Sequence, residues 1–215
     1  MITLEHISDT HLQPFPELKG ADILVHSGDA LNYGSIDELA KFRKQLEPIH
    51  HKYQHILYVP GNHDWAFEHN YNIAQEFLYE TIPNILVLHN QEWKHPTLPY
   101  KFYGTSDQPE FCNWAFNRNP EELTNSYSKI PDDTDILITH CPPHGILDYT
   151  MRGEHVGSKE LQFELFRLKN LKAHLFGHIH YSYGQIELNG VKYSNGATCG
   201  ENYRPINEPR IIELV

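Results

Sequence analysis

Side chains that can ligate metal ions are concentrated in five short motifs, and each motif follows a run of apolar residues. The motifs are Asp9-Thr10-His11, Gly28-Asp29, Gly61-Asn62-His63-Asp64, Thr139-His140 and Gly177-His178-Ile179-His180. Their carboxylate and amide oxygens and imidazole nitrogens suit divalent first-row ions such as Mn, Fe or Zn. Seven such side chains suffice for two ions that share one carboxylate. Two ions about 3.5–4 Å apart are a common device for displacement at a phosphate ester.

Strands are needed to bring these motifs to one place. Apolar runs predict strands over 2–7, 22–26, 55–59, 135–138 and 173–176, each of which ends just before a motif. Continuous apolar runs are typical of strands that are buried on both faces. Ligand sites in open α/β sheets lie beyond the carboxyl ends of the strands. We therefore expect the five motifs to meet at one end of the sheets.

Apolar stripes predict three helices between these strands. The first begins after Ser35, which with Glu38 has the spacing of a capping box. The expected buried stripes are Ile36, Leu39, Phe42 and Leu46 in the first helix, Ile73, Phe77 and Leu78 in the second, over 70–81, and Leu161, Leu165, Phe166 and Leu168 in the third, which starts near Ser158.

The rest of the chain completes an α/β pattern over one domain, residues 1–215. Further strands are predicted over 85–89, 101–104 and 211–215, and Asn189-Gly190 predicts a hairpin between 185–188 and 191–194. The stretch 106–131 has no clear period. It is either a surface loop with its own aromatic cluster or a wall of the substrate pocket, because long loops in compact domains are often functional.

Charge and cysteine content restrict the classes of partner and the cellular compartment that we expect for this chain. Seventeen basic and 28 acidic residues give a formal net charge of −11, which argues against a nucleic acid polymer as partner. A small phosphorylated substrate is still compatible, because bound cations reverse the local field. The three cysteines, Cys112, Cys141 and Cys199, form no CxxC and favour a reducing compartment. Neither a signal peptide nor an apolar run of ~20 residues is present, so we expect a cytoplasmic protein that does not interact with membranes.

The ordered motifs DxH, GD, GNH(D/E), H and GHxH resemble the calcineurin-like metallophosphoesterase superfamily. Residues 137–148 (LITHCPPHGILD), 157–159 (GSK), 195–197 (NGA) and 202–205 (NYRP) are also similar to its small MPPED-type branch, so the resemblance extends over nearly the whole chain. It implies the metallophosphoesterase fold, a two-sheet β-sandwich flanked by helices. It also implies a phosphoesterase that depends on two divalent metal ions, with Mn²⁺ favoured over Fe or Zn.

The resemblance also implies a role for each side chain in the motifs. Asp9, His11 and His180 would bind one ion, Asn62, His140 and His178 the other, and Asp29 would bridge both. The reaction implied is attack of hydroxide on phosphorus. His63 is not a ligand and would protonate the departing oxygen or stabilise transition-state charge. Asp64 would accept a hydrogen bond from His63 and fix its tautomer.

Several residues near the motifs are candidates for substrate contact, because loops at strand ends often carry function. They are Asn32, His144, Arg152 and His155, and Tyr33, Tyr149 and Tyr203 are candidates for stacking on a nucleobase. The alternatives are a turn residue for Asn32, surface or hydrogen-bonded core positions for the two histidines, an exposed side chain for Arg152 and packing for the tyrosines.

The leading functional hypothesis is hydrolysis of small phosphodiesters, with cyclic nucleotides favoured by the branch resemblance. A phosphomonoesterase or a protein phosphatase would use the same metals, and the shape of the loops decides between them. A non-catalytic metal-binding scaffold of the same fold is a further alternative. Such scaffolds typically lack a ligand or the catalytic histidine, and this chain has all seven ligands and His63. The oligomeric state is left open.

Overall fold

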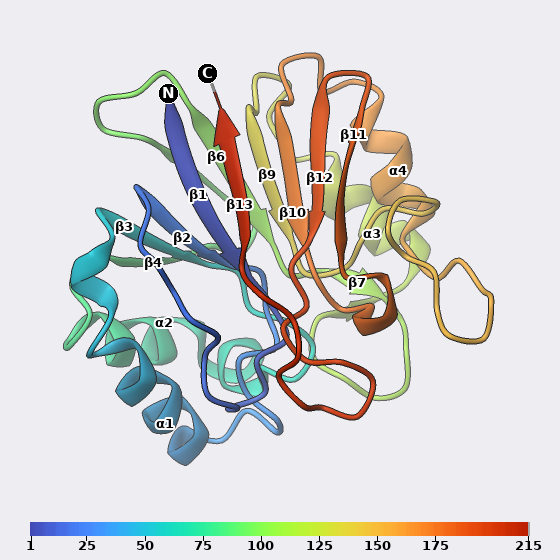
Figure 1. Ribbon diagram of the computed structural model, residues 1–215. Coiled ribbons are helices and arrows are strands. Elements are labelled where there is room, and N and C mark those ends of the chain that lie inside the picture. Colours follow the sequence, from blue (N-terminus) through green and yellow to red (C-terminus); the bar gives the residue numbers. More distant parts are fainter. Residues whose placement is uncertain (215) are drawn as a thin grey trace.

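Two β-sheets pack face to face in the computed structural model of the protein, which describes residues 1–214 (Figure 1). The first sheet has the strand order β13-β1-β2-β3-β4. Its strands are β1 (Ile2–Ile7), β2 (Ile23–His26), β3 (His55–Tyr58), β4 (Ile85–Val87) and β13 (Arg210–Leu214). Strands β1 to β4 are parallel, and β13 pairs with β1 in the antiparallel sense.

The second sheet has the order β11-β12-β10-β9-β6-β5. Its strands are β5 (Gln91–Lys94), β6 (Lys101–Thr105), β9 (Ile136–Thr139), β10 (Ala173–Phe176), β11 (Gly184–Leu188) and β12 (Val191–Asn195). The four central strands are parallel and the two edge strands are antiparallel. The predicted hairpin joins β11 to β12, with positive φ at both Asn189 and Gly190, as a type I′ turn requires.

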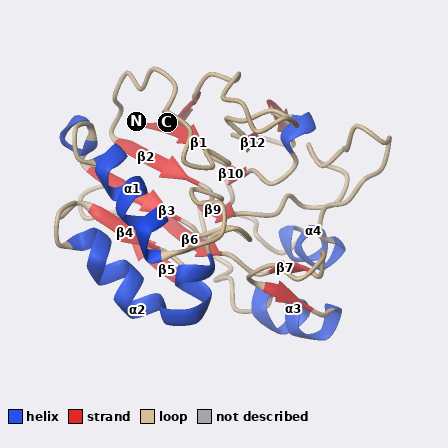
Figure 2. Ribbon diagram, turned by 90° about the horizontal axis from the view of Figure 1, so that it is seen from below, coloured by secondary structure: helices blue, strands red, loops and turns tan. Residues whose placement is uncertain are grey.

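Helices cover the outer faces of both sheets. They are α1 (Ile36–Leu46) and α2 (Trp65–Tyr79) on the first sheet, and α3 (Pro120–Tyr127) and α4 (Lys159–Leu165) on the second (Figures 1 and 2). Short 3₁₀ turns occupy His50–Lys52 (η1) and His180–Ser182 (η2), and β7 (Gln108–Pro109) pairs with β8 (Asn117–Arg118). No helix within residues 1–214 has the length and apolar character that a membrane crossing demands.

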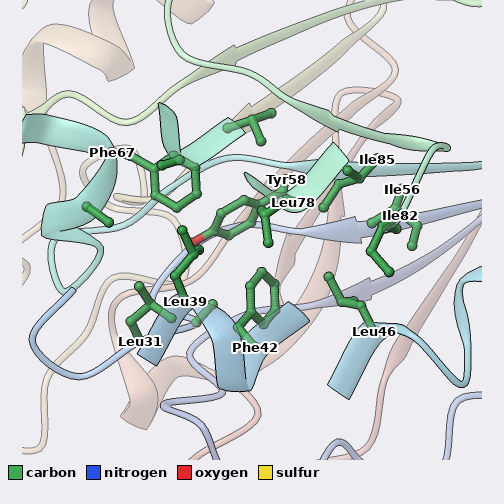
Figure 3. Close-up of a cluster of buried hydrophobic side chains, with 14 of the residues drawn as sticks. Leu31, Leu39, Phe42, Leu46, Ile56, Tyr58, Phe67, Leu78, Ile82 and Ile85 are labelled. Carbon is green, nitrogen blue, oxygen red and sulfur yellow. The ribbon is translucent and has the colours of Figure 1, made fainter. Parts of the chain in front are cut away.

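Successive side chains of a strand point to opposite faces of its sheet, so one strand contributes to two cores. In β2, Ile23 and Val25 lie in the core between the two sheets, whereas Leu24 packs in the helix-side core. The same helix-side core contains Phe42 of α1, Phe67 of α2 and Tyr58 of β3 (Figure 3). Every residue of a central strand such as β2 is therefore buried, which explains the continuous apolar runs in the sequence. The predicted two-sheet fold flanked by helices is confirmed.

Three predicted core positions are instead exposed, and each is explained by local geometry. Ile36 is 56% exposed in the first turn of α1, and burial in that helix begins only at Leu39. Ile73 is 61% exposed because Ala74 and Leu78 of α2 face the sheet, and one residue turns a helix by roughly 100°. Phe166 is 70% exposed because it follows the last helical residue of α4.

The irregular stretch 106–131 contains α3, which the sequence analysis missed. Asn119 accepts hydrogen bonds from the backbone N–H groups of Glu121 and Glu122, and the Glu122 carboxylate accepts one from the backbone N–H of Asn119. Pro120 occupies the first helical position, where its missing N–H removes no helical bond. A capping box with a proline at this position is a signal that the sequence alone carries.

The helix-side core makes a direct prediction about stability. Phe42 is buried against Tyr58 and His26, so Phe42→Ala is expected to lower the free energy of unfolding by about 3–5 kcal/mol. Ile36→Ala, on the exposed side of the same helix, is expected to change it by about 0.5 kcal/mol or less. Urea unfolding of both variants with metal chelated measures the difference. Equal losses for the two variants would contradict this account of the core.

Candidate metal centre

Five loops at the carboxyl ends of parallel strands carry the predicted ligands. Strands β1, β2 and β3 of the first sheet deliver Asp9, Asp29 and Asn62, and strands β9 and β10 of the second deliver His140 and His178. Figure 2 views the molecule from this end. The two sheets are joined here, because Ser8 pairs with Ala197 just beyond β1 and β12. Ligands from both sheets therefore meet at one seam.

Sharp turns follow these strands and aim the ligands inward. Asp9, His11, Asp29 and His178 all have φ between 45° and 69°, a region that residues other than glycine enter rarely and mostly at functional sites. Gly177 precedes such a turn with no room for a side chain, since a Cβ atom there would collide with the Asp9 carboxylate.

Gly28 and Gly61 serve a similar purpose on the first sheet. Gly28 has a φ of 109°, and a Cβ atom on Gly61 would collide with the Asp29 carboxylate. The glycines before the ligands thus let carboxylates lie directly against the backbone.

Asp9, His11 and His180 form the first cluster. The Nε2 atom of His180 lies 3.2 Å from Oδ1 of Asp9 and 3.4 Å from Nε2 of His11. The ligand atoms of all three residues lie within 4.8 Å of one another, so one ion can contact them together.

Asp29, His140 and His178 form the second cluster. The Nε2 atom of His140 is 3.3 Å from Oδ2 of Asp29 and 3.2 Å from Nδ1 of His178. The side-chain oxygen of Asn62 is 3.0 Å from the same Nε2 atom. Asp29 also forms a third group with His11 and His63, so it lies between the two clusters.

Backbone carbonyls fix the tautomers of three of these histidines. The Nδ1 atoms of His11, His140 and His180 donate hydrogen bonds to the carbonyl oxygens of Leu31, Ser27 and Gly200, at 3.2, 2.9 and 3.0 Å. In each neutral ring the Nε2 lone pair is then left facing its cluster, as in metal-ligating histidines. When both rings are neutral, the lone pairs of His11 and His180 face each other at 3.4 Å, an arrangement that a cation beside them stabilises. The donor set therefore fits divalent metal ions.

The buried carboxylates dominate the electrostatics of the centre. Burial by itself would lower the pKa of His140 and His180, but Asp29 and Asp9 respectively outweigh it and raise both pKa values to about 9. These imidazoles in turn hold the pKa of Asp9 and Asp29 below the ordinary range despite burial. Burial lowers the pKa of His178 to about 3, with a further contribution from His140.

A layer of neutral histidines lies beneath the ligand loops. His26 and His174 bond through Nε2 to the hydroxyls of Thr10 and Thr139, each at 2.9 Å. His6 lies between the hydroxyls of Ser194 and Ser27, also at 2.9 Å. Burial lowers the pKa of all three histidines to about 3, so they support the loops without adding positive charge.

Asp64 differs from its predicted role as the partner of His63. Its carboxylate accepts hydrogen bonds from the backbone N–H groups of Gly61, Asp29 and Leu31, at 2.6, 2.9 and 2.9 Å. Asp64 thus ties the loop after β2 to the loop after β3. The resemblance implied that Asp64 accepts a hydrogen bond from His63, whereas the turn at Gly61 directs this carboxylate toward the backbone.

His63 is held by a carbonyl and by an aromatic ring instead. Its Nδ1 atom donates to the backbone oxygen of Asn32 at 2.6 Å. The indole of Trp114 lies against the imidazole, with centroids 4.1 Å apart and planes inclined by 37°. Tyr203 closes another side of the centre, 4.7 Å from the His11 ring. The sequence analysis did not single out Trp114, although it lies in the irregular stretch proposed as a pocket wall.

Buried ion pairs anchor the loop that carries Trp114. Asp107 accepts hydrogen bonds from Asn90 and Ser126, at 3.0 and 2.6 Å, and pairs with Arg118 at 3.1 Å. Arg118 also pairs with Glu68 of α2 at 3.2 Å. Asn90, Asp107, Arg118 and Ser126 line a cavity of about 240 Å³, and their mutual contacts hold this loop against α2 and α3.

The four predicted substrate-contact residues are not gathered at the centre. Asn32 reaches His63 only through its backbone oxygen. His155 donates from Nδ1 to the buried Asp148 at 2.6 Å, and His144 lies 3.7 Å from the same carboxylate, so both histidines fasten their own loop. Arg152 is exposed near the tip of that loop, which projects from the body of the molecule between β9 and α4 (Figure 1).

The chain is similar to known proteins over most of its length. Residues 3–182 match the family of calcineurin-like phosphoesterases. Metallophosphoesterase domain-containing protein 1 of Homo sapiens is 32% identical over 228 residues, covering 97% of this chain and 69% of the relative. The 3',5'-cyclic adenosine monophosphate phosphodiesterase CpdA of Haemophilus influenzae is 25% identical, covering 83% of this chain and 61% of the relative. The crystal structure of TT1561 of Thermus thermophilus is similar in fold, with a TM-score of 0.64, 18% identity and coverage of 90% of this chain and 88% of that one.

The raised pKa values predict how metal binding depends on pH. Without metal, His140 and His180 carry protons below about pH 9, and ligation requires both rings to be neutral. Binding of Mn²⁺ at pH 7 is therefore expected to release about two protons, and the affinity should rise with pH up to about 9. Calorimetric titration in buffers of different ionisation enthalpy counts the protons. An affinity that is constant from about pH 6 to about pH 9 would contradict this electrostatic picture.

Proposed function

We propose that this chain, which belongs to the calcineurin-like phosphoesterase family, is a metal-dependent hydrolase of small phosphodiesters, with cyclic nucleotides as the favoured class. Family membership supports hydrolysis of phosphoric esters. The similarity to a cyclic nucleotide phosphodiesterase supports the narrower class. The observation that carries the proposal is a chain of three carboxylate–imidazole groups. The group of His11, Asp29 and His63 shares His11 with the first cluster and Asp29 with the second.

We assign the metal ligands as the clusters group them. Asp9, His11 and His180 would hold one ion, Asn62, His140 and His178 would hold the other, and Asp29 would contribute to both sites. Mn²⁺ is the favoured ion, because the donors mix hard oxygens with imidazole nitrogens. When bound, two such ions supply a nucleophile at neutral pH and neutralise the charge that develops on the phosphoryl group.

His63 is the proposed proton donor to the departing oxygen. Because the carbonyl oxygen of Asn32 can only accept, Nδ1 of His63 keeps its hydrogen in both protonation states. The proton that is gained and lost therefore resides on Nε2, which lies 3.9 Å from Asp29 at the metal centre. The indole of Trp114 packs against the imidazole and holds the ring in place.

The charge around the centre supports a diester over a monoester. Within the described residues, no Lys or Arg side chain is hydrogen-bonded to or stacked on any of the seven proposed ligands. A phosphomonoester carries a charge of about −1.5 to −2 at pH 7, whereas a diester carries a single negative charge. A centre without an additional basic side chain neutralises the second negative charge of a monoester less well.

A paired rate comparison tests this function. Wild-type protein loaded with Mn²⁺ is expected to hydrolyse bis(p-nitrophenyl) phosphate about tenfold faster than p-nitrophenyl phosphate, because no Lys or Arg side chain among the described residues is bonded to the proposed ligands and able to neutralise the second charge of the monoester. A cyclic nucleotide panel then narrows the class. Faster turnover of the monoester would favour a phosphatase instead. No turnover of either compound by protein with two bound ions would favour a binding scaffold.

The role of His63 is tested separately from metal binding. His63→Ala is expected to retain both ions and to lower kcat for the diester by about 10²–10⁴-fold, the range for loss of a general acid. Metal content by mass spectrometry and steady-state kinetics measure the two effects. His51→Ala, an exposed histidine in η1, is the control and should retain wild-type kcat. An unchanged kcat in metal-replete His63→Ala would rule out the proposed role.

A further inference from the structure

A cavity of about 250 Å³ opens directly beside the metal centre, against His180. The segment that begins with η2 and the loop between β12 and β13 form its walls, which are His180, Tyr181, Tyr183, Gly200, Glu201, Ile206 and Asn207. His180 also belongs to the first metal cluster, so the cavity shares a wall with that cluster. A cavity in this position is placed to receive a substituent of an ester bound at the centre.

Hydrogen bonds preform the loop that makes the outer wall. The N–H of Gly200 donates to the carbonyl of Arg204 at 3.0 Å, and the N–H groups of Ile206 and Asn207 both donate to the carbonyl of Thr198 at 3.1 Å. On the opposite wall, the Tyr183 hydroxyl donates to the carbonyl of Glu208 at 2.7 Å. The cavity therefore exists before any ligand binds, as small-molecule sites commonly do.

The walls combine unpacked apolar surface with hydrogen-bond acceptors. Tyr181 is 56% exposed and Ile206 is 68% exposed, so both can cover the faces of a flat ring. Asn207 uses its side-chain N–H₂ group on the carbonyl of Ala197 at 2.8 Å, which leaves its side-chain oxygen as an acceptor. Glu201 adds a carboxylate, which accepts only, and no Lys or Arg of the described chain lines the cavity. A ligand that is flat and rich in N–H donors matches these walls.

We propose that this cavity binds the guanine base of a cyclic nucleotide and that Glu201 determines the specificity for that base. The inference rests on the proposed phosphodiesterase function. Guanine presents a ring N–H beside an exocyclic amine, and these two adjacent donors match the two oxygens of one carboxylate. Adenine presents an amine beside a ring nitrogen that is an acceptor. That ring nitrogen would repel a carboxylate oxygen, because both can only accept hydrogen bonds. Glu201 therefore favours guanine over adenine, because only guanine supplies two adjacent hydrogen-bond donors.

The ratio of kcat/KM for 3',5'-cyclic GMP to that for 3',5'-cyclic AMP tests the proposal in the Mn²⁺-loaded full chain. The wild type is expected to favour the guanine nucleotide about tenfold or more, chiefly through KM, because the base lies away from the reacting atoms. Glu201→Gln replaces one acceptor oxygen by a donor group and should bring the ratio to within about twofold of one. The control is Glu187→Gln on β11, an exposed glutamate that does not line the cavity, which should keep the wild-type ratio.

The outcomes separate this proposal from the proposed function. If the wild type hydrolyses bis(p-nitrophenyl) phosphate but shows no preference between the two cyclic nucleotides, or keeps its preference in Glu201→Gln, the guanine assignment is wrong and the phosphodiesterase function stands. If no diester is hydrolysed, the proposed phosphodiesterase function is wrong. Equilibrium binding of 5'-GMP and 5'-AMP to the metal-loaded protein then tests the guanine assignment of the cavity. Tighter binding of GMP that is lost in Glu201→Gln would support the guanine assignment, and equal binding would overturn it.

Discussion

Two buried carboxylates at the seam between the sheets are the constraint that shapes their whole surroundings. Asp9 and Asp29 have almost no contact with solvent, and buried charges require compensating charge close by. Each carboxylate lies against an imidazole whose pKa it raises, and each fits against a glycine that leaves it room. The histidines, the glycines and the left-handed turns are thus consequences of one electrostatic requirement, which divalent cations also satisfy.

The two-sheet arrangement explains how one site collects ligands from residues 9 to 180. Parallel strands end on the same side, so β1, β2 and β3 deliver their loops beside those of β9 and β10. The core between the sheets fixes the spacing of those loops, and neutral histidines beneath them complete the hydrogen bonding without adding charge. Rigid support of this kind is what preorganised catalytic groups require.

Beyond the metal ligands, the surroundings of the centre consist of loops with separate anchors. The loop with Trp114 is held by the ion pairs of Asp107 and Arg118, and the loop with Glu201 is held by its own backbone hydrogen bonds. Each wall can therefore change without disturbing the metal clusters. Selectivity for the ester substituent can then vary on a constant phosphoryl site, which is how one fold serves many substrates.

Local sequence patterns were sufficient to predict the strands that carry the motifs, three of the four helices in outline and the residues that gather into clusters able to hold a metal ion. Burial on both faces requires continuous apolar runs, and strand ends expose the polar residues that follow them. Which groups meet was settled only by tertiary contacts. Asp64 bonds to three backbone N–H groups instead of His63, Trp114 stacks on His63, and His144 and His155 turn to Asp148. Such contacts depend on how turns aim side chains across long sequence separations, and no local pattern encodes that direction.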